Sequence, residues 1–117
     1  VHVPRARALI DRGTWIKHQY VILHELAHSY HDQVLGFENP AIVETYKQAE
    51  KAGLYERVLL FQGGMTRHYA RTNHKEFFAE MTESYVGLND FYPFVRAELK
   101  QHDPATYALM EKIWGKF

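Results

Sequence analysis

Hydrophobic residues recur every three or four positions between residues 14 and 35, which predicts one long helix with an apolar stripe. Thr14 can cap the start of this helix, and Gly36 is a residue type that commonly follows a helix end. The stripe should face a core, and the polar residues on its flank should line the wall of a cleft. Its members are Ile16, Tyr20, Leu23, Ala27, Tyr30 and Val34.

Four later helices are bounded by residue types that start or stop helices. Asn39-Pro40 and Asp103-Pro104 can begin two of them, and Thr72 or Asn73 can cap a third. Gly53 and Gly87 follow the ends of two. The first of the four is polar along most of its length, which is typical of a solvated surface element. These helices are expected over residues 41–52, 74–86, 95–101 and 105–114.

A β-hairpin is predicted between the second and third helices. Residues 55–61 and 65–70 are rich in β-branched, aromatic and other apolar residues, and Gly63-Gly64 between them is a hairpin-type turn. Residues 1–3 can form one further short strand before Pro4. The pattern therefore predicts a mainly helical α+β fold with a small hairpin, in a single domain over residues 1–117.

Composition narrows the classes of function. The 117 residues include 14 basic and 14 acidic side chains with no basic run, which argues against nucleic acid or an anionic membrane as a partner. The apolar runs are too short to span a bilayer. Because the chain has no cysteine, any bound metal must be held by histidine and carboxylate. The chain opens on Val1 without a signal-like segment, so we expect an excised domain, and neither localisation nor oligomeric state is predicted.

The first helix contains the spacing HExxH at residues 24–28. His24 and His28 are four residues apart, so they lie on one face of a helix and can direct ring nitrogens at the same ion. Glu25 lies about 100° around the helix, where its carboxylate can act on a water molecule rather than on the metal. This stretch alone thus offers two zinc ligands and a general base.

Three glutamates share one face of the helix over residues 74–86, namely Glu76, Glu80 and Glu83. Like charges at this spacing destabilise a helix, and a bound dication would reverse that cost. An ordinary solvated acidic face gives the same pattern. A catalytic zinc needs a third ligand, however, and Glu76 with Glu80 can supply one carboxylate for the metal and another for the far N–H of a ligand histidine.

Other sources of the third ligand are less suitable. Position 34 is Val34, which excludes the metzincin pattern with its third histidine. His31 lies about 10 Å along the axis from His24, too far to share one zinc with His24 and His28. We therefore expect His31 to be a second-shell or structural residue, and His74 has no predicted role.

The two motifs together, His24-Glu25-x-x-His28 and Glu76-x-x-x-Glu80, resemble the gluzincin pattern. Residues 69–80 are also similar to the corresponding part of the lethal-factor-like family of zinc metallopeptidases, and the resemblance extends over about residues 15–87. It implies a zincin-like fold with HExxH on a long active-site helix, and it is compatible with secretion without predicting it.

The resemblance also implies roles for individual residues. One zinc per chain would be held by His24, His28 and Glu76, and Glu80 would take the second-shell position. Glu25 would be the general base, and Tyr69 would donate a hydrogen bond to the oxyanion.

One departure from the family concerns the substrate. Zincin substrates usually lie along the edge strand of a sheet that precedes the HExxH helix, and only thirteen residues precede this one. Residues 1–3 would have to serve as that edge, or a larger protein would have to supply it.

The predicted function is a zinc-dependent endopeptidase that hydrolyses a peptide or protein substrate. The alternative is a non-catalytic, zinc-stabilised domain that binds peptide or protein, in which the same metal only holds two helices together. A third alternative is a helical domain without metal. For the first, Glu76→Gln should weaken zinc binding strongly, whereas Glu83→Gln should not.

Overall fold

The computed structural model describes residues 21–116. The predicted strand at residues 1–3, the Thr14 cap and the stripe positions Ile16 and Tyr20 lie outside the described residues. Within the described range the protein is mainly helical and has one small antiparallel sheet, so the predicted α+β class is confirmed at this level. No helix between residues 21 and 116 combines the length and the apolar character needed to cross a membrane.

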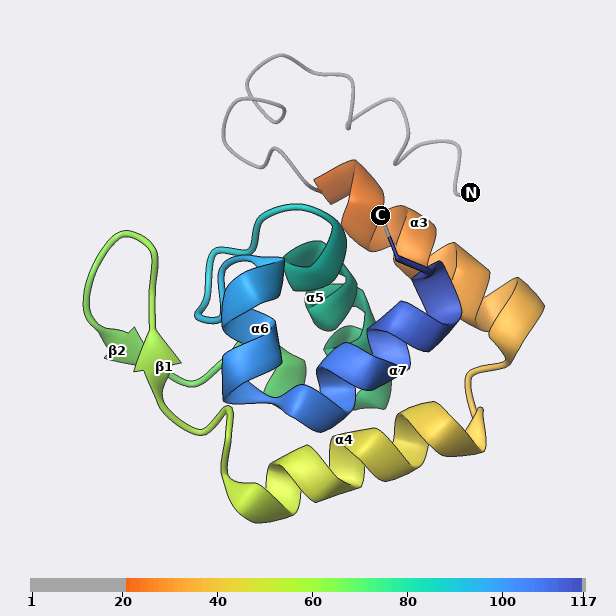
Figure 1. Cartoon of the computed structure of the whole chain (residues 1–117), viewed down its shortest axis with the longest axis horizontal. Coiled ribbons are helices and arrows are strands. Elements are labelled where there is room, and N and C mark those ends of the chain that lie inside the picture. The colour runs from red at the N-terminus through yellow and green to blue at the C-terminus, as the bar shows by residue number, and fades with distance from the viewer. Residues whose placement is uncertain (1–20, 117) are drawn as a thin grey trace.

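Helix α5 (His74–Val86) lies at the centre of the fold (Figure 1). Within residues 21–116 it contacts every other α-helix and the short 3₁₀-helix Tyr69–Arg71 that leads into it. The surrounding helices are α3 (Val21–Tyr30), α4 (Pro40–Ala52), α6 (Arg96–His102) and α7 (Pro104–Trp114). Because α5 is surrounded by these helices, each of its faces packs against a different neighbour.

The predicted helix boundaries around α4 and α5 are confirmed. The side chain of Asn39 accepts hydrogen bonds from the first backbone N–H groups of α4, and Gly53 ends that helix in the left-handed conformation with φ 69°. The side chain of Asn73 accepts a hydrogen bond from the backbone N–H of Glu76 at 2.9 Å. Helix α5 then ends at Gly87, as expected. Local capping chemistry thus defines the two elements.

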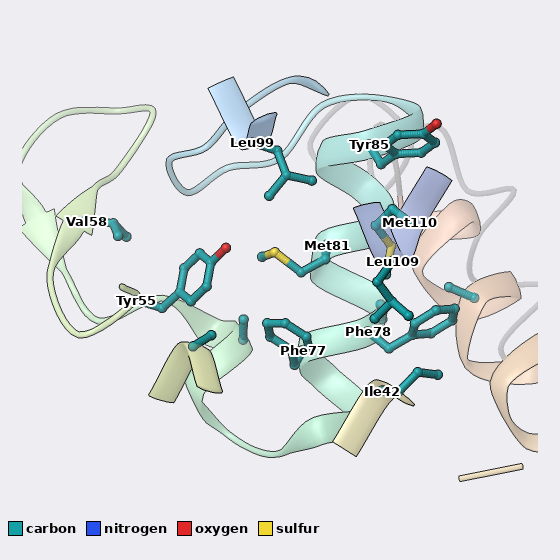
Figure 2. Packing of buried hydrophobic residues seen from close by; sticks show 14 residues of the cluster. Ile42, Tyr55, Val58, Phe77, Phe78, Met81, Tyr85, Leu99, Leu109 and Met110 are labelled. Atoms are coloured by element: carbon teal, nitrogen blue, oxygen red, sulfur yellow. The ribbon is translucent and has the colours of Figure 1, made fainter. Parts of the chain in front are cut away.

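The hydrophobic core is built on the side of α5 that carries its aromatic residues (Figure 2). Phe77, Phe78 and Met81 are fully buried there, and α4 adds Ile42 from below. Helices α6 and α7 contribute Leu99, Leu109 and Met110. Helix α4 therefore has a buried face and is not purely a solvated surface element.

The first helix ends at the predicted place but not with the predicted winding. After α3, residues His31–Leu35 form a π-helical turn that stops at Gly36, whose φ is 83°. A π-turn is wider than an α-turn, so it rotates the residues that follow relative to an ideal α-helix. As a result Val34, predicted on the apolar stripe, is 63% exposed, whereas His31 is fully buried. The sequence prediction was wrong for Val34.

The hairpin is present but shorter than predicted. Strands β1 (Val58–Leu59) and β2 (Met65–Thr66) pair antiparallel, and both turn glycines have positive φ. Residues 69 and 70 belong to the 3₁₀-helix instead of the second strand. The reason is local, because the ring Nδ1 of His68 accepts a hydrogen bond from the backbone N–H of Ala70 at 3.0 Å and turns the chain there.

Candidate metal centre

Helices α3 and α5 pack against each other and bring the two predicted motifs together. The Nε2 atom of His24 lies 3.0 Å from Oε1 of Glu76, and Nε2 of His28 lies 3.0 Å from the same oxygen. The two Nε2 atoms are 3.1 Å apart. Three donor atoms from two helices therefore meet in a nearly equilateral triangle.

This triangle fits a small metal ion. Zinc bonds of about 2.0–2.1 Å in a tetrahedron place neighbouring ligand atoms about 3.3 Å apart. The sides of 3.0 and 3.1 Å are close to that spacing, and two imidazoles with one carboxylate are a donor set that zinc accepts. His24, His28 and Glu76 can thus hold a metal ion through one atom each.

The other nitrogen of His24 faces two more carboxylates of α5. Its Nδ1–H donates a hydrogen bond to Oε2 of Glu83 at 2.7 Å, and Oε2 of Glu80 lies 3.1 Å from the same nitrogen. The sequence analysis expected Glu80 here and gave Glu83 no role. The seven-residue interval between Glu76 and Glu83, two helical turns, was the available signal that both can reach the same partner.

Charge in this cluster shifts the pKa values of its members. Burial by itself lowers the pKa of His24, but the hydrogen bonds and charges of Glu80 and Glu83 outweigh it and raise the pKa to about 10. Burial and the nearby Glu80 raise the pKa of Glu83 to about 8, although its hydrogen bond with His24 acts the other way. The site therefore favours a positive charge between α3 and α5, carried by a proton or by a metal cation.

A second set of donors overlaps with the first. Within residues 21–116, the donor atoms of His24, Glu80 and Glu83 also lie within 4.8 Å of one another. This set uses Nδ1 of His24, whereas the triangle with His28 and Glu76 uses Nε2. Only the triangle contains two imidazoles, which favours it for zinc.

The two predicted catalytic residues are neighbours of His24, Glu25 in sequence and Tyr69 in space. Glu25 follows His24 on α3 and is half-buried. Tyr69 is 46% exposed, and its ring centroid lies 6.5 Å from that of His24. The 3₁₀-helix that carries Tyr69 leads directly into α5, so the tyrosine approaches the site from the solvent side without being on a strand.

His31 lies apart from this cluster. Its side chain is fully buried, and neither ring nitrogen has a hydrogen-bond partner among the described residues. Its ring packs against Phe37 and Phe78, with centroids 5.1 and 4.8 Å away. This environment is that of a structural core residue and does not support a ligand.

His74 ties the first turn of α5 to the loop before α4. Its Nε2–H donates a hydrogen bond to the backbone carbonyl of Phe37 at 2.7 Å. The contact fixes the N-terminal end of the helix that carries Glu76, so His74 helps to set where α5 begins relative to α3.

Comparison with known proteins adds nothing to this geometry. No protein-family model, no curated protein and no solved structure matches the chain. What the described residues establish is a pair of packed helices whose histidine and glutamate side chains can hold a metal ion.

Proposed function

We propose that this chain is a zinc-dependent endopeptidase domain of the gluzincin type. The observation that carries the proposal is the triangle formed by His24, His28 and Glu76, with sides of 3.0, 3.0 and 3.1 Å. It joins two motifs separated by about fifty residues. A candidate base, Glu25, follows His24 in sequence, and the ring of a candidate hydroxyl donor, Tyr69, lies 6.5 Å from that of His24.

The roles of the residues follow from their positions. Bound zinc supplies Lewis acidity, which polarises a carbonyl group and acidifies a water molecule. Glu25 accepts a proton from the attacking water at its carboxylate and returns it to the leaving amine. The Tyr69 hydroxyl donates a hydrogen bond to the carbonyl oxygen of the scissile bond as negative charge develops on it.

Access to the site supports a macromolecular substrate. The side chains of His28 and Glu76 remain 22% and 21% exposed, so solvent reaches part of both ligands. Tyr69, whose ring lies 6.5 Å from that of His24, is 46% exposed. A peptide segment can therefore approach the ligands from solvent, while the aromatic core behind α5 stays closed.

The test is cleavage of a mixed peptide library by the zinc-loaded protein, with and without a chelator. Glu25→Gln should reduce cleavage by about 10⁴ because it removes the general base. Tyr69→Phe should reduce it by about 10², the typical effect of losing one oxyanion donor. Both variants should still bind one zinc per chain, because neither side chain is a ligand.

Glu44→Gln is a matched control, since it makes the same change of charge on the exposed face of α4. Near-full cleavage by Glu25→Gln would contradict the mechanism. If the parent protein binds zinc but cleaves no peptide, the non-catalytic, zinc-stabilised binding domain becomes the better description.

A further inference from the structure

The contact between His24 and Glu83 is shorter than the other histidine–glutamate contacts of this cluster, which measure 3.0 Å or more. Nδ1 of His24 lies 2.7 Å from Oε2 of Glu83, compared with 3.1 Å for Oε2 of Glu80. An imidazole N–H points in one direction within the ring plane, so it can serve only one acceptor well. The single proton on Nδ1 is therefore directed mainly to Glu83.

Helix α5 holds the His24 ring at both ends. Glu76 contacts Nε2 and Glu83 contacts Nδ1, although the two glutamates are about 10 Å apart along the helix axis. The side chains of these two glutamates, two helical turns apart, thus converge on the two nitrogens of one ring. Its tilt, and with it the direction of the Nε2 lone pair, depends on both contacts.

Burial strengthens this contact. The side chain of Glu83 is only 14% exposed and that of His24 only 15%, so little water competes for the hydrogen bond. A hydrogen bond in such surroundings is stronger than the same bond in water. When the proton is held on Nδ1 in this way, Nε2 carries the lone pair of the ring and can bind a metal ion.

We propose that Glu83 is the positioning residue of the metal site, the side chain that fixes the tautomer and orientation of His24 so that Nε2 faces the ion. This inference rests on the proposed function, because it assumes that zinc binds His24, His28 and Glu76. It reverses the expectation from sequence that Glu83→Gln does not weaken zinc binding. Glu80 makes the longer contact with Nδ1 of His24.

Glu80 has a second neighbour that accounts for its position. Its Oε1 lies 3.9 Å from Nδ1 of His68, a ring that is fully buried on the other side of the carboxylate. Glu80 therefore stands between two histidines, whereas Glu83 contacts His24 and Glu80. Because the two glutamates have different contacts, replacing each one should change zinc binding by a different amount.

The test is the zinc dissociation constant, measured by competition with a chelator of known affinity. Glu83→Gln should weaken zinc binding by about 10–100-fold, the usual effect of losing an outer-shell carboxylate. Glu80→Gln should weaken it by a smaller factor, and Glu44→Gln on α4 should leave it unchanged. Glu83→Asp keeps the charge but withdraws it by one methylene, so an intermediate loss is expected.

A second readout separates positioning from a merely structural role. In the zinc-loaded parent, the NMR signal of the His24 Nδ1 proton should lie far downfield because of its short hydrogen bond. Glu83→Gln should move this signal upfield, and Glu80→Gln should move it less. A structural role alone would lower the melting temperature of Glu83→Gln without moving the signal.

The outcomes distinguish this inference from the proposed function. A dissociation constant for Glu83→Gln and Glu83→Asp within twofold of the parent value overturns the inference alone. A parent protein that binds zinc but cleaves no peptide overturns only the proposed hydrolysis. A parent protein that binds no zinc overturns both.

Discussion

Two pairs of histidines in this protein have opposite surroundings. His24 and His28, the metal-site histidines, face carboxylates of α5 at 2.7–3.0 Å. His31 and His68, the core histidines, are fully buried, and three of their four ring nitrogens have no hydrogen-bond partner among the described residues. The difference shows that the opposing residue, more than the histidine itself, decides what the ring can do.

The contrast is visible in the pKa values. Carboxylates raise the pKa of His24 to about 10 in spite of burial, which by itself lowers it. Burial lowers the pKa of His31 and of His68 to about 4. For His31 the nearby His74, His28 and Lys75 act in the same direction, and for His68 burial outweighs the opposing effect of Glu80. One pair therefore attracts positive charge and the other excludes it.

Helix α5 produces both environments because its faces differ. One face presents glutamates to α3, whereas the other presents Phe77 and Phe78 to the core. His31 is only three residues along the chain from His28, yet its ring lies 4.8 Å from that of Phe78. Only three residues thus separate His28, a candidate ligand, from His31, which is packed among aromatic rings.

The largest expected effect comes from exchanging the two kinds of histidine for the same residue. His28→Phe should abolish stoichiometric zinc binding, because it removes one of three ligands. His31→Phe should leave the zinc dissociation constant within about twofold of the parent value, because that ring contacts no ligand and packs among aromatics. Metal analysis after gel filtration compares the two.

If His31→Phe lost its zinc while its circular dichroism stayed that of the folded parent, the division between metal-site and core histidines would be wrong. The outcome would mean that the π-helical turn transmits the state of His31 to His28.

The next effect concerns metal removal. Zinc that binds only the folded state, at a free concentration about 1,000 times its Kd, should stabilise the protein by about 4 kcal/mol. It also offsets the repulsion among the three glutamates of α5. Chelation should therefore lower the melting temperature by at least about 10 °C, as measured by calorimetry.

Glu76→Gln is the control for this prediction. Its melting temperature should respond little to zinc or chelator, since it lacks the ligand on α5 that ties the two helices through the metal. An unchanged melting curve of the parent after demonstrated zinc removal would contradict the prediction.

The smallest expected effect is a decrease in the free energy of unfolding at acidic pH, caused by the core histidines. The pKa of His31 is about 4 in the folded protein against 6.5 in the unfolded chain, so between these values only the unfolded chain binds the proton. The free energy of unfolding should be fully present above pH 6.5 and fall as the pH is lowered towards 4. The fall attributable to His31 should be about 3 kcal/mol.

Urea unfolding of the metal-free protein between pH 7 and pH 4 measures this step. His31→Phe should show a shallower fall than the parent, because one titrating group is gone while the metal-site cluster is the same in both. Equal slopes would mean that His31 is not buried in its neutral form. His68 should add a step of the same sign.

Much of the local structure could be predicted from sequence because it depends on short-range chemistry. Asn39 and Asn73 cap the helices that they were expected to cap, and Gly53 and Gly87 end them. The pairing of HExxH with the glutamate face of α5 was likewise expected, since both motifs are defined by helical spacing. The zinc itself, the peptidase activity and the roles of Glu25 and Tyr69 stay predictions.

Long-range packing decided the features that sequence reasoning missed. Tyr55 was expected in a strand, but it is buried with its hydroxyl donating to Asp103 at 2.8 Å, and the sheet keeps only two residues per strand. Tyr69 was expected on the second strand, and the His68 ring turns the chain into a 3₁₀-helix before it. The partner of Tyr55 is 48 residues away, beyond the reach of local propensity, whereas the turn at His68 is local but depends on a side-chain to backbone hydrogen bond that strand propensity does not describe.

The sequence by itself determined which side chains share a helix face, because helical periodicity is a local property of the chain. Periodicity paired His24 with His28 and put Glu76, Glu80 and Glu83 on one face, and the family resemblance implied Glu76 as the third ligand. Only the tertiary structure decided that His31 is sealed by Phe78 and that Glu83, not only Glu80, contacts His24. Those contacts depend on how α3 and its π-helical turn are rotated against α5, and that rotation is set by the packing of the whole core.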